Sequence, residues 1–312
     1  MIELARVDLS AGEDEVARRI DAACREVGFF TVVGHGVDPG LQDRMDAAAR
    51  AFFARPEAEK APIAMARGGR AWRGWFPLHG ELTAGVPDHK EGLYFGRELP
   101  PDDRLLHGPN LWPSDDLRIA VTAWMDAMEG VARALARAVG LGLGLGADWF
   151  ARHLTADPTV LFRIFRYPPV DADGWGVAEH TDYGLLTLLA QDDQGGLQVR
   201  GRDGWIDVPP EPGALVVNLG DMLDRMTGGR YRSTPHRVVP PSGAADRLSF
   251  PFFFDPSWDA EVRPLPLTGE APPDDAATRW DGTSLRHLDG TYGEYLSAKV
   301  AKVFPALAST DG

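Results

Sequence analysis

The chain has 312 residues, of which 44% are hydrophobic and 25% are charged, values typical of globular proteins and unlike those of disordered or fibrous chains. The formal net charge of −14 argues against a nucleic-acid partner, because affinity for DNA and RNA depends largely on lysine and arginine contacts to phosphates. The single cysteine, Cys24, excludes a disulfide within the chain.

The N-terminal sequence and the hydropathy pattern indicate where the protein resides. The first residues lack the basic and apolar regions of a secretory signal, so we expect a cytoplasmic protein. No apolar run approaches the roughly 20 residues needed to span a bilayer, so we expect no membrane partner. The sequence does not predict the oligomeric state.

The first hundred residues predict a supporting region of strands and helices. We expect a strand at 3–8, a helix at 13–27 and a strand at 29–33. A second helix follows Asp38, because the apolar residues from Leu41 onward recur at steps of three and four and therefore share one face. This helix is amphipathic and supports the core.

The middle of the chain changes character twice. Residues 62–112 are rich in Gly, Pro and Trp and show little periodicity, so we expect a long irregular connection that packs on the main domain. Ser114 is a suitable N-cap, with Asp115 and Asp116 in the first turn after it. A long helix is therefore predicted from there to about residue 139, where glycines follow.

The remainder of the chain consists mainly of short β-rich runs separated by Pro, Gly and Asp. We expect eight strands, at residues 160–167, 176–180, 185–190, 197–199, 205–208, 214–218, 236–239 and 247–254. This number and spacing favour a double-sheet jelly roll or a barrel. Two further helices are expected, at 221–227 and 292–304.

We therefore predict a mainly β protein with flanking helices, in which a jelly-roll core (a double-stranded β-helix) is joined to a helical N-terminal part. One domain is expected to span residues 1–312. Its parts are an N-terminal supporting region at 1–112, a long helix and connection at 113–157, a catalytic core at 158–256, and a C-terminal tail and helix at 257–312.

One histidine and one aspartate on a predicted strand offer metal ligands. His180 and Asp182 are two residues apart, and in an extended segment this spacing sends both side chains to the same face. His236 lies 54 residues beyond Asp182, at the start of another predicted strand. Two neutral imidazoles and one carboxylate form a facial triad, which suits Fe(II) and leaves adjacent coordination positions open. A 2-oxo acid and O2 could occupy those positions.

An arginine and a serine offer a site for the far carboxylate of 2-oxoglutarate. Arg247 can bind a carboxylate through two hydrogen bonds, and Ser249, on the same face of a strand, can add a third. A turn-rich link separates Arg247 from His236 and would bring the two residues into one cavity. Arg163 and Arg166 are further candidates for binding a small acid despite the negative net charge.

These spaced residues carry a resemblance to a known family. The pattern of H-x-D, then a distant histidine, then R-x-S resembles the 2-oxoglutarate and Fe(II)-dependent oxygenase superfamily, in its isopenicillin N synthase-like branch. The matching positions here are His180, Asp182, His236, Arg247 and Ser249. The resemblance implies an iron dioxygenase that uses 2-oxoglutarate and O2, oxidises a small-molecule substrate by hydroxylation or a related C–H oxidation, and releases succinate and CO2.

The resemblance extends beyond the triad. Segments 28–36 and 107–113 are similar to the family's N-terminal strand and to a stretch common in its bacterial members. The family tends to place an asparagine and a tyrosine near the co-substrate on the strand before H-x-D. Here Tyr167 matches the tyrosine, but Phe165 stands where asparagine is usual. The resemblance therefore adds Tyr167 to the candidate 2-oxoglutarate contacts.

Family-like placement and the frequent use of aromatic side chains as pocket walls suggest candidate substrate-pocket residues. They are Arg73 and Phe95 in the irregular connection, and Phe252 and Phe254 on the last predicted strand. The identity of the substrate, the position and type of its oxidation, and any lid motion are not predicted by the sequence.

Other functions remain open at this point. Relatives such as isopenicillin N synthase and aminocyclopropane-carboxylate oxidase imply an iron oxidase that does not consume 2-oxoglutarate, and R-x-S could then hold the substrate's own carboxylate. Residues 180–186 also resemble the microbial ethylene-forming enzyme. A metal-binding jelly roll without catalysis, acting as a sensor or scaffold, is the third alternative. It explains the combination of an open metal face and an arginine less well.

Overall fold

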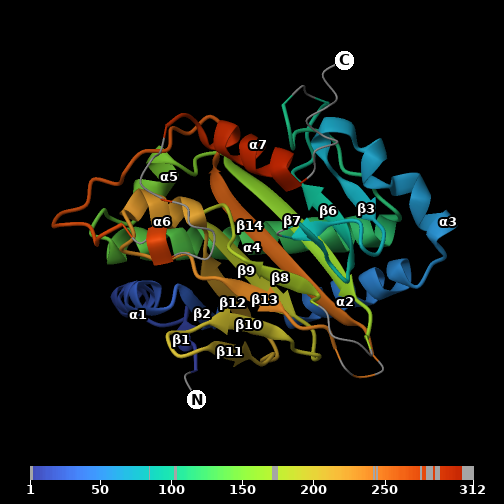
Figure 1. Cartoon of the computed structure of the whole chain (residues 1–312), viewed down its shortest axis with the longest axis horizontal. Helices are drawn as coiled ribbons and strands as arrows, with labels where there is room; N and C mark the ends of the chain where they lie inside the picture. The colour runs from blue at the N-terminus through green and yellow to red at the C-terminus, as the bar shows by residue number, and fades with distance from the viewer. Residues whose placement is uncertain are drawn as a thin grey trace.

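Two β-sheets facing each other form the centre of the structure, a computed structural model (Figure 1). It describes residues 3–303 except 84, 102–103, 171–174, 242, 244, 275, 279–283 and 285–288. The strands of the larger sheet are β1 (Ala5–Asp8), β2 (Phe29–Val33), β3 (Gly74–Phe76), β6 (Glu91–Gly96), β7 (Pro158–Tyr167), β9 (Leu186–Gln191), β12 (Leu215–Leu219) and β14 (Arg247–Ser257). Those of the smaller sheet are β8 (Val177–His180), β10 (Leu197–Arg200), β11 (Trp205–Val208) and β13 (His236–Val238).

The strand order confirms the predicted jelly roll. The larger sheet runs β1-β2-β12-β9-β14-β7-β6-β3, and the smaller sheet runs β11-β10-β13-β8. The eight strands expected after residue 158 are β7 to β14, and they divide equally between the two sheets. Pairing is antiparallel throughout this part, and β14 lies between β7 and β9. The predicted bounds differ from the observed ones by a few residues at most.

A long helix, α4 (Asp115–Gly142), lies behind the larger sheet, and α1 (Glu13–Glu26) and α2 (Pro39–Phe53) pack against this helix (Figure 1). The other helices are α3 (Glu57–Lys60), α5 (Trp149–His153), α6 (Asp221–Thr227) and α7 (Tyr292–Val303). The expected N-cap of α4 is confirmed, because the Ser114 side chain accepts a hydrogen bond from the backbone N–H of Leu117. Among the described helices, none combines the length and the apolar character that crossing a membrane requires.

The long helix continues beyond its predicted end. It passes Gly140, where a Cβ atom would lie 2.5 Å from the backbone oxygen of Gly146. The absence of a side chain therefore allows the returning chain to contact the helix at this turn. A glycine that sequence reasoning took as a helix end serves here as a contact point inside the helix.

The segment at 62–112 is more regular than predicted. Besides short 3-10 turns, it forms β3 and β6, which extend the larger sheet beyond β7, and a small hairpin of β4 (Leu82–Thr83) and β5 (Val86–Pro87). Every residue of β6 is buried, so this strand has no alternation of polar and apolar residues. Periodicity therefore could not reveal it.

The two faces of β14 have different roles. Residues at even positions are buried against the helices. For example, the guanidinium of Arg133 in α4 lies 5.8 Å from the ring centre of Phe254. Residues at odd positions face the space between the two sheets. The even set is Leu248, Phe250, Phe252 and Phe254, and the odd set is Arg247, Ser249, Pro251, Phe253 and Asp255.

Candidate metal centre and adjoining cavity

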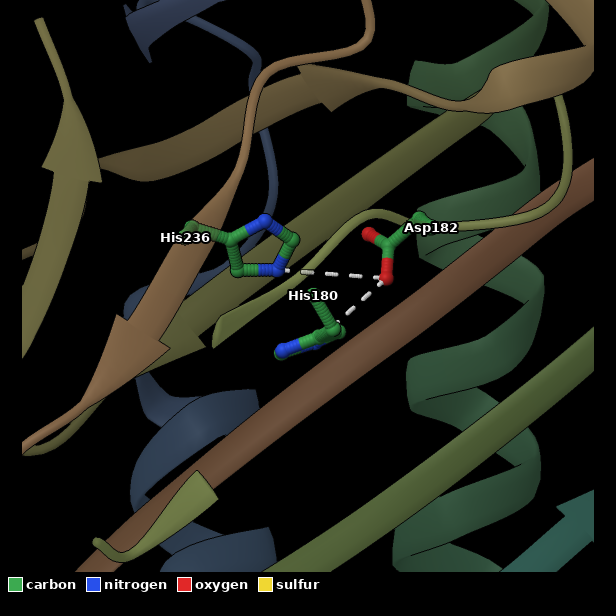
Figure 2. Close-up of side chains that lie close together, drawn as sticks. All are labelled: His180, Asp182 and His236. Atoms are coloured by element: carbon green, nitrogen blue, oxygen red, sulfur yellow. Dashed lines mark ion pairs between the residues drawn. The ribbon is translucent and has the colours of Figure 1, made fainter. Parts of the chain in front are cut away.

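Three potential metal ligands converge between the sheets (Figure 2). The Nε2 atoms of His180 and His236 each lie 3.9 Å from Oδ1 of Asp182. His180 ends β8 and pairs with His236 at the start of β13, so strand pairing joins ligands that are far apart in the sequence. One ligand atom from each residue lies within 4.8 Å of the others. The structure thus brings together the three residues predicted as a triad.

Hydrogen bonds orient the ligand atoms. Nδ1 of His180 lies 2.8 Å from the backbone oxygen of Ala178, and Nδ1 of His236 lies 3.3 Å from that of Thr234. Since a carbonyl only accepts, Nδ1 donates in each ring, and Nε2 keeps the lone pair that faces the centre. The ring of Phe29 packs edge-on against His236, with 5.3 Å between ring centres.

The carboxylate of Asp182 is oriented in the same way. Its Oδ2 atom accepts hydrogen bonds from the Thr187 hydroxyl at 2.6 Å and from the Asn218 side-chain amide at 2.7 Å. Oδ1 is therefore the oxygen turned toward the two imidazoles. Two imidazole nitrogens and one carboxylate oxygen, each oriented by a hydrogen bond from the surrounding structure, form a donor set that suits Fe(II).

The protonation states agree with ligand roles. Burial and the neighbouring His236 lower the pKa of His180 to about 3, so this ring is neutral near pH 7. Burial opposes ionisation of Asp182, but the two histidines and its hydrogen bonds hold the pKa of its carboxyl below the usual value. A neutral imidazole and an ionised carboxylate are the forms that bind a metal ion.

The amide that supports Asp182 provides a test of this arrangement. Replacing Asn218 with alanine should weaken Fe(II) binding by about 10-fold or more, because loss of a hydrogen bond behind a ligand typically costs that much in affinity. The measurement is the Fe(II) dissociation constant, obtained by competition with a chelator. Gln194→Ala removes an exposed side-chain amide and is the control. Equal iron affinity in both variants would show that Asn218 does not support the metal.

A cavity of about 490 Å³ lies beside the three ligands, between the two sheets. Residues at alternate positions of β7 and β14 form one wall, since both strands turn the same face inward. The wall residues on β7 are Leu161, Arg163, Phe165 and Tyr167. Cavities of this size commonly hold small molecules.

Arg247 presents a hydrogen-bond donor inside this cavity. Its side chain is buried, its Nε donates to the backbone oxygen of Gly195, and its Nη2 donates to the side chain of Gln191 at 3.1 Å. Its Nη1 is buried and has no partner among the described residues. Tyr167 lies opposite in the strand register, with its ring centre 4.9 Å from the guanidinium carbon, and Ser249 lines the same wall. This combination of donors suits a carboxylate.

The predicted substrate-pocket residues lie elsewhere. Phe252 and Phe254 occupy even positions of β14 and are fully buried on the helical side, so Pro251 and Phe253 replace them as lining residues. Arg73 and Phe95 are also buried outside this cavity. The guanidinium of Arg73 donates to the backbone oxygen of Leu106 at 2.8 Å. The period of two along β14 places Phe252 and Phe254 on the side opposite Arg247 and Ser249.

The structure also separates the other candidate arginines and brings in residues that sequence reasoning missed. Arg163 lines the cavity, whereas Arg166 faces the other side of β7 and forms ion pairs with Glu91 and Asp246. The lining residues missed by sequence reasoning include Glu81, Lys90, Tyr183, Asp255 and Lys299. The sequence could have predicted that Arg163 lines the cavity. Arg163 is four residues before Tyr167 on the same strand, and side chains an even number of residues apart share a face.

The last helix is connected through Asp255 to the loop that carries Asp182. The hydroxyl of Tyr292, in the first turn of α7, donates to one carboxylate oxygen of Asp255 at 2.6 Å. The backbone N–H of Leu185 donates to the other oxygen at 3.0 Å. Gly184 lies directly against this carboxylate, and a Cβ atom there would be 1.5 Å from Oδ1. The loop that carries Asp182 is therefore held by a contact that only glycine permits.

Gly184→Ala should consequently destabilise the protein. The added methyl group must displace a carboxylate that two hydrogen bonds hold, and such overpacking typically costs about 1–3 kcal/mol in the free energy of unfolding. The measurement is denaturant unfolding of the metal-free protein. Gly130→Ala, at an open position in α4, is the control and should not destabilise. An unchanged stability of Gly184→Ala would mean that Asp255 moves freely.

Comparisons with known proteins agree with this geometry. Residues 1–115 match the family described as non-haem dioxygenase in morphine synthesis N-terminal, and residues 158–256 match the 2OG-Fe(II) oxygenase superfamily. The chain is 41% identical to a protein of Dictyostelium discoideum named as a probable iron/ascorbate oxidoreductase, over 94% of this chain and 90% of that protein.

Two further similarities are informative. The 1-aminocyclopropane-1-carboxylate oxidase of Dictyostelium discoideum is 33% identical, over 94% of this chain and 91% of that enzyme. The crystal structure of a full-length Neurospora crassa protein in complex with alpha-KG superposes with a TM-score of 0.80 at 26% identity, covering 97% of this chain and 99% of that one.

Proposed function

Because this chain belongs to the 2OG-Fe(II) oxygenase superfamily and is an Fe(II)- and 2-oxoglutarate-dependent dioxygenase, we propose that His180, Asp182 and His236 are its iron ligands. The observation that carries this assignment is the convergence of three oriented donor atoms on one point beside the cavity. The enzyme oxidises a small molecule while 2-oxoglutarate is converted to succinate and CO2.

We propose further that Arg247, Ser249 and Tyr167 bind the far carboxylate of 2-oxoglutarate. The Nη1 of Arg247, unpartnered among the described residues, supports this role, because a buried donor without an acceptor is costly unless a ligand supplies one. The cavity connects these residues with the three metal ligands. The co-substrate would thus be fixed at one end by the arginine and at the other by the metal.

The residues around the three candidate iron ligands would then orient these ligands and exclude water from the site. When bound, Fe(II) together with 2-oxoglutarate activates O2 for oxidation of a C–H bond. Thr187 and Asn218 hold Asp182 in its ligand orientation, and the carbonyl groups behind the histidines keep both Nε2 atoms turned inward. Apolar walls that include Phe253 and Leu161 limit access of water to the reacting groups.

Three finer points are also proposals. A large hydrophobic cluster that runs from the first strand to the last helix supports one domain spanning the chain. The net charge of −14 supports the absence of a nucleic-acid partner, and the single cysteine, which can form no disulfide within the chain, supports a cytoplasmic location. A size measurement of the purified protein is needed for its oligomeric state.

The test of the site is an anaerobic titration of the Fe(II)-loaded protein with 2-oxoglutarate. We expect the weak visible metal-to-ligand charge-transfer absorption of a chelated 2-oxo acid. If iron binds but no such absorption develops, the 1-aminocyclopropane-1-carboxylate oxidase relative becomes the better guide and 2-oxoglutarate-independent oxidation must be assayed. Failure to bind iron at all would overturn the ligand assignment.

A further inference from the structure

A second arginine lies in the same cavity as Arg247. Arg163 and Tyr167 are on the same face of β7, four residues apart, which places them about 13 Å apart along the strand. Tyr167 pairs with Arg247 in the register of β7 and β14. If Arg247 and the metal hold the two ends of 2-oxoglutarate, that co-substrate has no further charged group for Arg163.

Among the described residues, the guanidinium of Arg163 has no hydrogen-bond acceptor of its own. Its Nε is buried without a partner there, and the nearest carboxylate oxygen that forms an ion pair with it, Oε1 of Glu81, is 3.9 Å from Nη1. The rings of Tyr94 and Phe253 lie on the guanidinium, with their centres 4.3 and 4.8 Å from its central carbon. The arginine is therefore fixed in place by ring contacts, while its donors stay available within the described part of the cavity.

The carboxylates near Arg163 are already partnered. Glu81 accepts a hydrogen bond from the Tyr94 hydroxyl and lies 2.8 Å from Nζ of Lys90. Asp255 accepts hydrogen bonds from Tyr292 and from the backbone of Leu185. Oε2 of Glu81 is balanced by its ion pair with Lys90, whereas the donors of Arg163 have no acceptor within hydrogen-bond distance among the described residues, and a ligand that complements them is an anion.

We propose that Arg163 is the substrate-binding arginine of this enzyme and that the primary substrate is a small organic acid whose carboxylate it holds. Phe253, Phe165 and Leu161, which line the same wall, would contact the apolar part of the acid. This inference rests on the proposed function, because it assumes that 2-oxoglutarate occupies the Arg247 end. Nothing in it requires a particular substrate.

Another cation of this region is a natural control. Lys299 in α7 also lines the cavity, but its Nζ lies 3.7 Å from a carboxylate oxygen of Asp221 and 5.2 Å from the ring centre of Tyr183. Its charge is therefore balanced locally. If an acid binds in the cavity through general positive charge, removing either cation should weaken its binding. If it binds through the guanidinium, only the loss of Arg163 should weaken its binding.

The experiment measures equilibrium binding to the anaerobic enzyme loaded with Fe(II) and 2-oxoglutarate. The probes are phenylacetate, 3-phenylpropionate and hexanoate, each compared with its primary amide by titration calorimetry. We expect at least one acid to bind about 10-fold or more tightly than its amide, because hydrogen bonds to a charged group are strong. If no acid on the panel is preferred over its amide, the inference is wrong.

Variants then locate the preference. Arg163→Gln should abolish the preference for acids over amides, and Lys299→Gln should retain it. The reverse pattern would overturn the assignment. If Arg163→Gln does not fold, Arg163→Lys decides: it keeps the charge but loses the planar pair of donors, so the preference should weaken severalfold. An unweakened preference in Arg163→Lys would also overturn the proposal.

The charge-transfer titration with 2-oxoglutarate separates this inference from the proposed function. Arg163→Gln should show the same absorption and the same 2-oxoglutarate affinity as the wild-type enzyme. An intact absorption without any acid preference would disprove the substrate assignment alone. Absence of the absorption in the wild-type enzyme would disprove the proposed co-substrate site.

Discussion

Replacing Asp182 with alanine is expected to abolish Fe(II) binding and turnover. The change removes the one anionic ligand and leaves two imidazoles, which together bind a divalent cation far less well than the complete set. Because substitutions behind a ligand already cost about 10- to 100-fold, loss of the ligand itself should lower iron affinity and succinate formation by more than about 100-fold. Iron content after dialysis and 2-oxoglutarate-dependent succinate release are the two measurements.

The control for this variant is the same substitution at an aspartate that does not belong to the group of three candidate metal ligands. Asp193→Ala changes an exposed carboxylate and should keep full iron content and activity. Removing Asp182 also leaves the side chains of Thr187 and Asn218 without their acceptor, so circular dichroism must establish that the variant is folded. A folded Asp182→Ala enzyme with wild-type turnover would sink the assignment of the triad.

The convergence of His180, Asp182 and His236 was predictable from the sequence because these residues lie at or next to recognisable strands. His180 and Asp182 share a face through the two-residue spacing, and the strand that begins with His236 was recognisable as β-rich. The pairing of β8 with β13 then brings His236 next to His180, although the two residues are far apart in the sequence. Thr187 and Asn218 were not predicted, because a supporting hydrogen bond leaves no pattern in a sequence of this kind.

Two of the residues predicted for the substrate pocket, Phe252 and Phe254, do not line the cavity. Positions 250 and 252–254 are all phenylalanine, so hydrophobicity alone does not distinguish the cavity side of β14 from its helical side. The period of two does distinguish them: Arg247 and Ser249 occupy the inward face, and the same parity selects Phe253 rather than Phe252 or Phe254. Residues that share a strand must therefore be assigned together.

Other features depend on contacts between distant segments and had no local signal. The link from Tyr292 through Asp255 to Leu185 joins three separate parts of the chain, and each residue alone resembles an ordinary core or turn residue. Likewise, β6 is buried on both faces and lacks the alternation by which a half-exposed strand is recognised. Tertiary packing, rather than sequence periodicity, determines both features.

Arg247→Lys is expected to raise the dissociation constant for 2-oxoglutarate by about 10- to 100-fold, since each hydrogen bond to a charged group contributes about 1.5–3 kcal/mol. Lysine keeps a positive charge but replaces a planar pair of donors by a single ammonium group. It also cannot reproduce the bonds from Arg247 to Gly195 and Gln191 that aim the guanidinium. The measurement is the anaerobic charge-transfer titration, which reports co-substrate binding without turnover.

Arg163→Lys is the matched control, because it makes the same exchange at the other arginine of the described cavity wall. If Arg247 binds 2-oxoglutarate and Arg163 binds the substrate, only the first exchange should weaken the titration. Equal weakening by both would mean that the two arginines act on one ligand, which the roughly 13 Å of strand between their positions disfavours. If Arg247→Lys binds 2-oxoglutarate with wild-type affinity, Arg247 does not bind the co-substrate, and another group must bind its far carboxylate.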